Sequence, residues 1–73
     1  MNKFQAMAQI MAILCEDGSL PKGSDKYKIA RKLVSSRIER LGPDAAYNNV
    51  KMNKNALLEQ IEEVQRFWGL DRF

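Results

Sequence analysis

Apolar residues recur at helical spacing along most of the chain, and no stretch of useful length alternates as a β-strand would. The run Phe4–Cys15 contains no charged residue in twelve positions, and its apolar side chains cover nearly the whole circumference of a helix. Only Gln5, Gln9 and Glu16 form a narrow polar stripe. Such a helix lies at the centre of its bundle or is covered by something else. We predict it over residues 3–16.

A second amphipathic segment follows a turn-rich connection over residues 17–23. Ser24 is a favoured N-cap residue and Gly42–Pro43 is a favoured stop, which predicts a helix over residues 24–41. Its apolar positions fall into two stripes, and two stripes on one helix indicate two neighbours. The main stripe consists of Tyr27, Ala30, Val34, Ile38 and Leu41, and the smaller one consists of Ile29 and Leu33.

The C-terminal part of the chain predicts one more main helix, over residues 54–68, which starts near Asn53 or Asn55. Pro43 suits the first position of a helix, so a short helix is expected at 43–49. The core stripe of the last helix consists of Leu57, Ile61, Val64 and Trp68. The expected fold is therefore all-α: one domain over residues 1–73, a small bundle of three main helices and a short one.

The composition removes most catalytic chemistry, because the chain has no His and a single Cys. A His-based general base, a Cys–His pair and a His-rich metal site are all excluded. No nucleophile–base pair, metal-ligand cluster or phosphate-binding loop is found either, so we expect no enzyme activity, no cofactor and no metal. Cys15 lies in the apolar run and suits a small buried hydrophobe better than a reactive thiol.

The length of 73 residues indicates a small domain of marginal stability, because such a chain buries only about 60% of its unfolded surface. A monomer, a homodimer and a partner-stabilised state are all compatible with this size. A lone Cys forms no internal disulfide, and the N-terminal apolar run lacks the cleavage pattern of an export signal. That run is also too short to span a bilayer. We therefore expect a cytoplasmic protein with no membrane contact.

Charge is unevenly distributed along the chain, which carries a formal +3 in total. Residues 18–42 contain seven Lys/Arg against two acidic residues, whereas residues 56–73 contain four acidic residues against two Arg. Four cations form a candidate binding patch for nucleic-acid phosphates or an acidic protein: Lys22, Lys28, Arg31 and Lys32. The alternative is an ordinary solvated helix face.

Three apolar residues are candidates for a protein interface: Ile29, Leu33 and Phe67. The smaller stripe formed by Ile29 and Leu33 either packs on another helix of the bundle or contacts a partner inside a cationic rim. Arg37, beside this stripe, either pairs within the chain with Glu63 or Asp44, which we favour, or contacts the partner.

Two functions follow from these features. The first is a small regulatory protein that docks on a larger protein, supported by the surplus of apolar helix surface and by Met7 and Met11 as adaptable contacts. Chains of this size without catalytic residues are frequent among phage regulators and inhibitors of host transcription. The second is direct DNA or RNA binding through the basic face of the second helix. The connection over 17–23 is longer than a helix-turn-helix turn, and the acidic last helix would repel phosphate.

Overall fold

The computed structural model describes residues 1–18 and 20–67. These residues form four α-helices and no strand, so the expected all-helical fold is confirmed. The helices are α1 (Lys3–Cys15), α2 (Asp25–Leu41), α3 (Pro43–Met52) and α4 (Lys54–Phe67). The short helix expected at 43–49 is a full ten-residue element that continues to Met52. Trp68, expected in the core stripe, lies outside the described residues.

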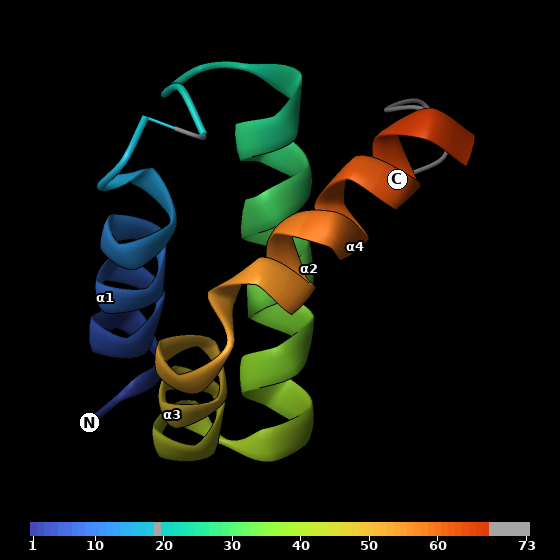
Figure 1. Ribbon diagram of the computed structural model, residues 1–73. Helices are drawn as coiled ribbons and strands as arrows, with labels where there is room; N and C mark the ends of the chain where they lie inside the picture. The colour runs from blue at the N-terminus through green and yellow to red at the C-terminus, as the bar shows by residue number, and fades with distance from the viewer. Residues whose placement is uncertain (19, 68–73) are drawn as a thin grey trace.

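Each of the four helices contacts the other three, and α4 packs mainly on α2. α1 and α2 lie side by side and run in opposite directions (Figure 1). α3 packs against both of them near the beginning of α1. α4 crosses α2 diagonally, and its last turn extends past the rest of the bundle (Figure 1). One side of the α1–α2 pair therefore carries no further helix, as the exposure of its residues shows below.

The helix ends are set by residues that satisfy backbone groups locally. The Ser24 Oγ accepts a hydrogen bond from the Tyr27 N–H at 3.2 Å and thereby caps α2. At the other end of α2, the Gly42 N–H donates to the Ile38 carbonyl oxygen at 2.8 Å. Gly42 has a φ of 90°, a left-handed conformation that favours glycine, and Pro43 follows it at the start of α3.

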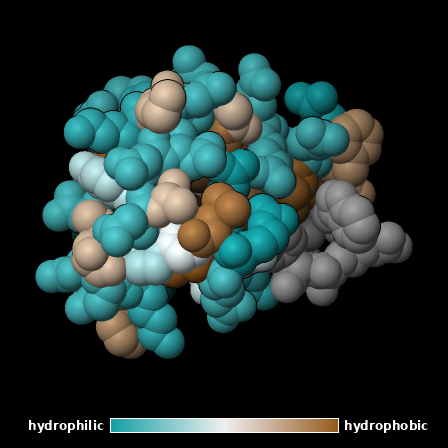
Figure 2. Space-filling model, turned by 90° about the horizontal axis from the view of Figure 1, so that it is seen from below, coloured by the Kyte–Doolittle hydropathy of each residue, from teal (hydrophilic) through white to brown (hydrophobic). Residues whose placement is uncertain are grey.

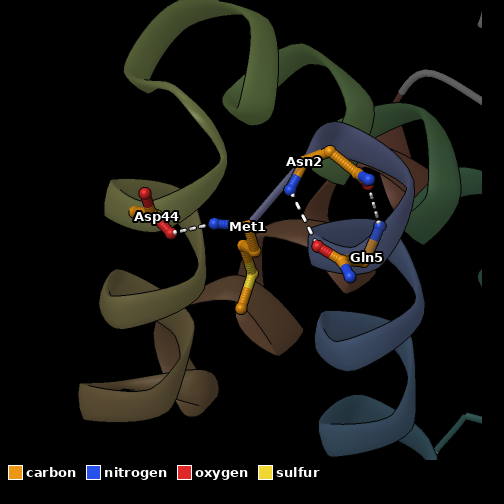
Figure 3. Close-up of polar contacts among 4 residues, drawn as sticks. All are labelled: Met1, Asn2, Gln5 and Asp44. Carbon is orange, nitrogen blue, oxygen red and sulfur yellow. Dashed lines mark hydrogen bonds and ion pairs between the residues drawn. The ribbon is translucent and has the colours of Figure 1, made fainter.

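The beginning of α1 is held by a capping box and by an ion pair to α3 (Figure 3). The Gln5 N–H donates to the Asn2 Oδ1 at 2.8 Å, and the Asn2 N–H donates to the Gln5 Oε1 at 3.0 Å. The Met1 ammonium lies 2.9 Å from the Asp44 Oδ1. Both interactions fix the first turn of α1, which carries Phe4.

The core is entirely apolar in the part of the chain that the structure describes, and each helix contributes to it. From α1 it takes one face only, formed by Ala6, Ile10, Met11 and Leu14. Burial of each Leu or Ile side chain contributes about 1.5–3 kcal/mol. The remaining members are Leu20, Ile29, Ala30, Val34, Ile38, Ala46, Val50, Leu57 and Ile61.

Polar contacts to α4 use one side of α2. The Lys26 Nζ lies 3.4 Å from the Glu62 Oε1, and an Arg37 Nη donates to the Gln60 Oε1 at 3.0 Å. The predicted pairing of Arg37 with Glu63 or Asp44 is therefore wrong. The contact is within the chain, but the way α2 and α4 cross brings an amide to the guanidinium instead of a carboxylate.

Lys54, at the start of α4, bridges to the end of α1. Its Nζ lies 3.1 Å from the Asp17 Oδ2 and 3.6 Å from the Glu16 Oε1. The hydrogen bond with Asp17, together with the charges of both carboxylates, raises the pKa of Lys54 above its ordinary value. The ammonium also offsets two negative charges at a helix C-terminus, where they are unfavourable.

Candidate functional site

A groove runs along the line where α1 lies against α2, on the side of this pair that no further helix covers. It consists of three adjoining hollows of about 520, 510 and 220 Å³, all of which include Met7. We call it the α1–α2 groove. Its α1 wall is formed by Phe4, Met7, Ala8, Met11, Ala12 and Cys15. Its α2 wall is formed by Tyr27, Lys28, Arg31, Lys32, Ser35 and Ile38.

The α1 wall exists because α1 has more apolar surface than the core can take. The core uses the face that carries Ile10 and Leu14, and the apolar residues of the opposite side stay outside. Phe4 is 74% exposed, and Ala8 and Ala12 are exposed one helical turn apart. An exposed aromatic side chain forgoes about 1.5–3 kcal/mol of burial energy. Phe4, Ala8 and Ala12 therefore form the exposed part of this wall, and the other three residues of the wall pack in or against the core.

The α2 wall carries a row of cations beside the apolar residues of the α1 wall. Lys28, Arg31 and Lys32 are all exposed and lie on the side of α2 opposite to α4. Lys22 extends the row at the end of the groove where α1 finishes. Glu39, at the other end, is the one acidic side chain among the described residues that line the groove. The electrostatic potential along this wall is consequently positive over most of its length.

The structure thus brings the four predicted basic residues together along one groove: Lys22, Lys28, Arg31 and Lys32. Periodicity placed three of them on one helix face. Their apolar neighbours come from α1, which the sequence pattern of α2 alone does not reveal.

The predicted apolar contacts fall in three different places. Ile29 is 0% exposed and belongs to the core, which corrects the expectation that it contacts a partner. The smaller stripe packs inside the bundle, and Leu33 is partly buried against the same core. Phe67 is 69% exposed, but it lies in the last turn of α4 and does not line the groove.

Phe4 is the groove residue that sequence reasoning missed. Its spacing placed it on the same side as Met11 and Leu14, which predicts burial. In the first turn of α1, however, the Phe4 side chain is 74% exposed, and the Lys3 Nζ lies 5.3 Å from the centroid of its ring. The available signal was the uncharged run Phe4–Cys15, whose apolar surface exceeds what a chain of this length covers.

A second, smaller hollow of about 240 Å³ lies on α4 and is mainly acidic. Its carboxylates are exposed, so nothing there desolvates them as acid–base catalysis requires. It is lined by Glu59, Glu62, Glu63, Arg66 and Phe67.

Residues 1–18 and 20–67 contain neither a metal-binding cluster nor a membrane-spanning helix. No three His, Cys, Asp or Glu side chains of this part lie close enough together to hold a metal ion. None of its helices combines the length and apolar character needed to cross a bilayer.

The face seen in Figure 2 is covered mainly by hydrophilic residues, with apolar side chains in small separate groups. The α1–α2 groove brings apolar residues of α1 beside the cations of α2.

No family model, no curated protein and no solved structure matches this chain. The function of the chain is therefore inferred from the geometry of the α1–α2 groove.

Proposed function

We propose that this protein is a non-enzymatic regulatory module that binds an acidic surface of a larger protein through the α1–α2 groove. The observation that carries the proposal is the exposed Phe4 together with Ala8 and Ala12 on the α1 wall, opposite the cations of the α2 wall. Protein interfaces combine an apolar centre containing aromatic and Met side chains with a polar rim. Positive charge at the rim speeds the encounter with an acidic partner and selects against basic ones.

The proposed regulatory role includes a class of target protein. Small chains that lack catalytic residues are frequent among phage-type regulators and inhibitors, and many of these act on host transcription machinery in the cytoplasm. The α1–α2 groove supports such a role because it gives a chain of 73 residues a surface on which a larger protein can bind. Occupation of a site on a larger protein requires no chemistry from the regulator itself.

A second candidate function is direct binding to DNA or RNA, favoured by the cation row from Lys22 to Lys32. Phosphate contacts depend on charge and weaken steeply with salt. The apolar residues of the α1 wall give no advantage in phosphate contacts, whereas a protein partner gains binding free energy by covering them. An exposed Phe4 therefore favours the protein-binding function.

A capture experiment with matched variants separates these functions. Phe4→Ala and Phe67→Ala each remove one ring of similar exposure, 74% and 69%, from different surfaces. The tagged full-length chain and both variants are incubated with nuclease-treated lysate, and bound proteins are identified by mass spectrometry. We expect one acidic protein to be retained by the wild type and by Phe67→Ala. Loss of a buried aromatic anchor weakens binding by more than about 30-fold, so Phe4→Ala should lose this partner.

The remaining outcomes contradict the proposal. A partner that depends on Phe67 but not on Phe4 would move the contact to α4. Capture that disappears with nuclease treatment in the wild type would favour the nucleic-acid function instead.

A further inference from the structure

We infer that the α1–α2 groove binds an amphipathic helix of about 13 residues whose acidic side chains lie along one edge of its apolar stripe. This inference rests on the proposed function and specifies its ligand. It follows from three properties of the groove: its secondary-structure environment, its length and the difference between its two walls.

The environment favours a helical ligand over an extended one. Both walls are helices, whose backbone N–H and C=O groups are paired internally, and the described residues contain no strand edge. An extended peptide in the α1–α2 groove would bury backbone N–H and C=O groups without hydrogen-bond partners, which costs free energy. A helix satisfies its own backbone and needs only an apolar face to lie in a groove.

The length of the ligand is set by α1. The groove extends from Cys15 and Lys22 at one end to Lys3 and Glu39 at the other. This is the length of α1, thirteen residues, or about 20 Å at 1.5 Å per residue. A ligand helix of about three and a half turns fills it, with apolar residues at positions i, i+3, i+4 and i+7.

The two walls require different edges on that helix. On the α1 side, Ala8 and Ala12 are small, exposed and uncharged, so a helix backbone can approach closely there. On the α2 side, Lys28 and Arg31 are one turn apart and face outward. Acidic residues are therefore favourable only on the ligand edge that lies against α2. Spaced three or four positions apart, they match the spacing of these cations.

The ends of the groove also differ in charge. Lys22 adds a cation beside Cys15, whereas Glu39 introduces a carboxylate at the end near Phe4. Lys3 also lies at that end, next to the Phe4 ring. The part of the ligand that carries most acidic residues is thus expected at the Lys22 end.

A second copy of this chain fits these requirements poorly. Its α4 is acidic on the outer face, through Glu59 and Glu63, but the apolar stripe of that helix is already buried in its own core at Leu57 and Ile61. No continuous apolar stripe is left for the groove among the described residues of α4. The ligand is therefore a helix of another protein.

The test uses three synthetic fluorescein-labelled peptides of equal length and the full-length protein. The first peptide has a Leu/Met stripe with Glu along one edge, the second has Lys in place of Glu, and the third has the first composition in scrambled order. Fluorescence anisotropy measures binding. We expect the first peptide to bind at least about tenfold more tightly than the other two, and to gain helix content by circular dichroism on binding.

Variants of the protein locate this binding. Phe4→Ala should weaken binding of the acidic peptide by about tenfold or more, and Phe67→Ala should leave it unchanged. Arg31→Glu should lower the affinity for the acidic peptide and raise that for the Lys peptide. This exchange of preference is not produced by a loss of folding.

The contradictory outcomes are distinguishable. Equal binding of the acidic and scrambled peptides means that charge alone attracts them, and it overturns the inferred amphipathic helix. Absence of binding, with a protein still captured through Phe4, overturns the helical ligand and leaves the proposed function standing. If the peptide does not bind and no protein is captured through Phe4, the inferred helical ligand and the proposed function are both overturned. Self-association of the wild type that Phe4→Ala abolishes, measured by sedimentation, would identify the ligand as a second copy.

Discussion

The two sides of α2 use similar cations for different purposes. On the side that faces α4, Lys26 contacts Glu62 at 3.4 Å and Arg37 contacts Gln60 at 3.0 Å. These two cations help hold the last helix on the bundle.

On the opposite side, Lys28 and Arg31 form no ion pair within residues 1–18 and 20–67, and they line the α1–α2 groove together with Met7. The comparison shows that the number of basic residues on a helix does not define a binding surface. What distinguishes the groove side is the exposed apolar wall of α1 beside its cations.

The largest expected effect is on the free energy of unfolding, and it comes from a substitution on the buried side of α2. Ile29→Ala removes a side chain that is 0% exposed, and it should lower the free energy of unfolding by about 2–5 kcal/mol. For so small a domain this is most of its stability. Urea unfolding followed by circular dichroism measures it. An unchanged midpoint would mean that Ile29 lies outside the core and would restore it as a candidate contact.

A matched pair of charge reversals tests the comparison itself. Arg31→Glu should weaken binding of the acidic amphipathic peptide by about five- to tenfold while the unfolding midpoint stays unchanged, because Arg31 is exposed. Arg37→Glu should do the opposite. It loses the hydrogen bond to Gln60 and about 1 kcal/mol of stability, with little effect on peptide affinity. If both variants lowered affinity equally, only net charge would matter and the two sides of α2 would be equivalent.

The smallest expected effect concerns pH and the bridge from α4 to α1. The pKa of Lys54 is raised above 10.5 in the folded chain by Asp17 and Glu16. Its stabilisation is therefore fully present below 10.5 and is lost as the pH rises through the higher folded value. The difference in Tm between the wild type and Lys54→Gln should be small at neutral pH and disappear in strong alkali. A Tm difference that grows with pH would contradict a stabilising contact of Lys54 with Asp17 and Glu16.

Local chemistry predicted the helix ends well. Ser24, Gly42 with Pro43, and Asn53 act as sequence rules expect, since each satisfies backbone groups within a few residues. The helix expected at 43–49 continues to Met52, although Asn48 and Asn49 are poor helix formers. Packing of Ala46 and Val50 into the core holds the helix through to Met52.

Features that depend on how helices pack could not be predicted in the same way. Two apolar stripes on α2 indicated two neighbours, but the periodicity did not say that both lie within the chain. The partner of Arg37 depends on the crossing of α2 and α4, and the exposure of Phe4 depends on which residues of the other helices cover the first turn of α1. The groove combines residues from two helices, so neither helix's pattern contains it.

The most direct test of the docking groove is an NMR titration of the ¹⁵N-labelled full-length chain with the acidic amphipathic peptide. We predict that amide shifts change along the groove, at Met7, Ala8, Ala12, Lys28 and Arg31, and stay constant at Glu59 and Glu63 on α4. Shift changes confined to α4, or spread evenly over every basic residue, would contradict the assignment of the α1–α2 groove as the binding surface.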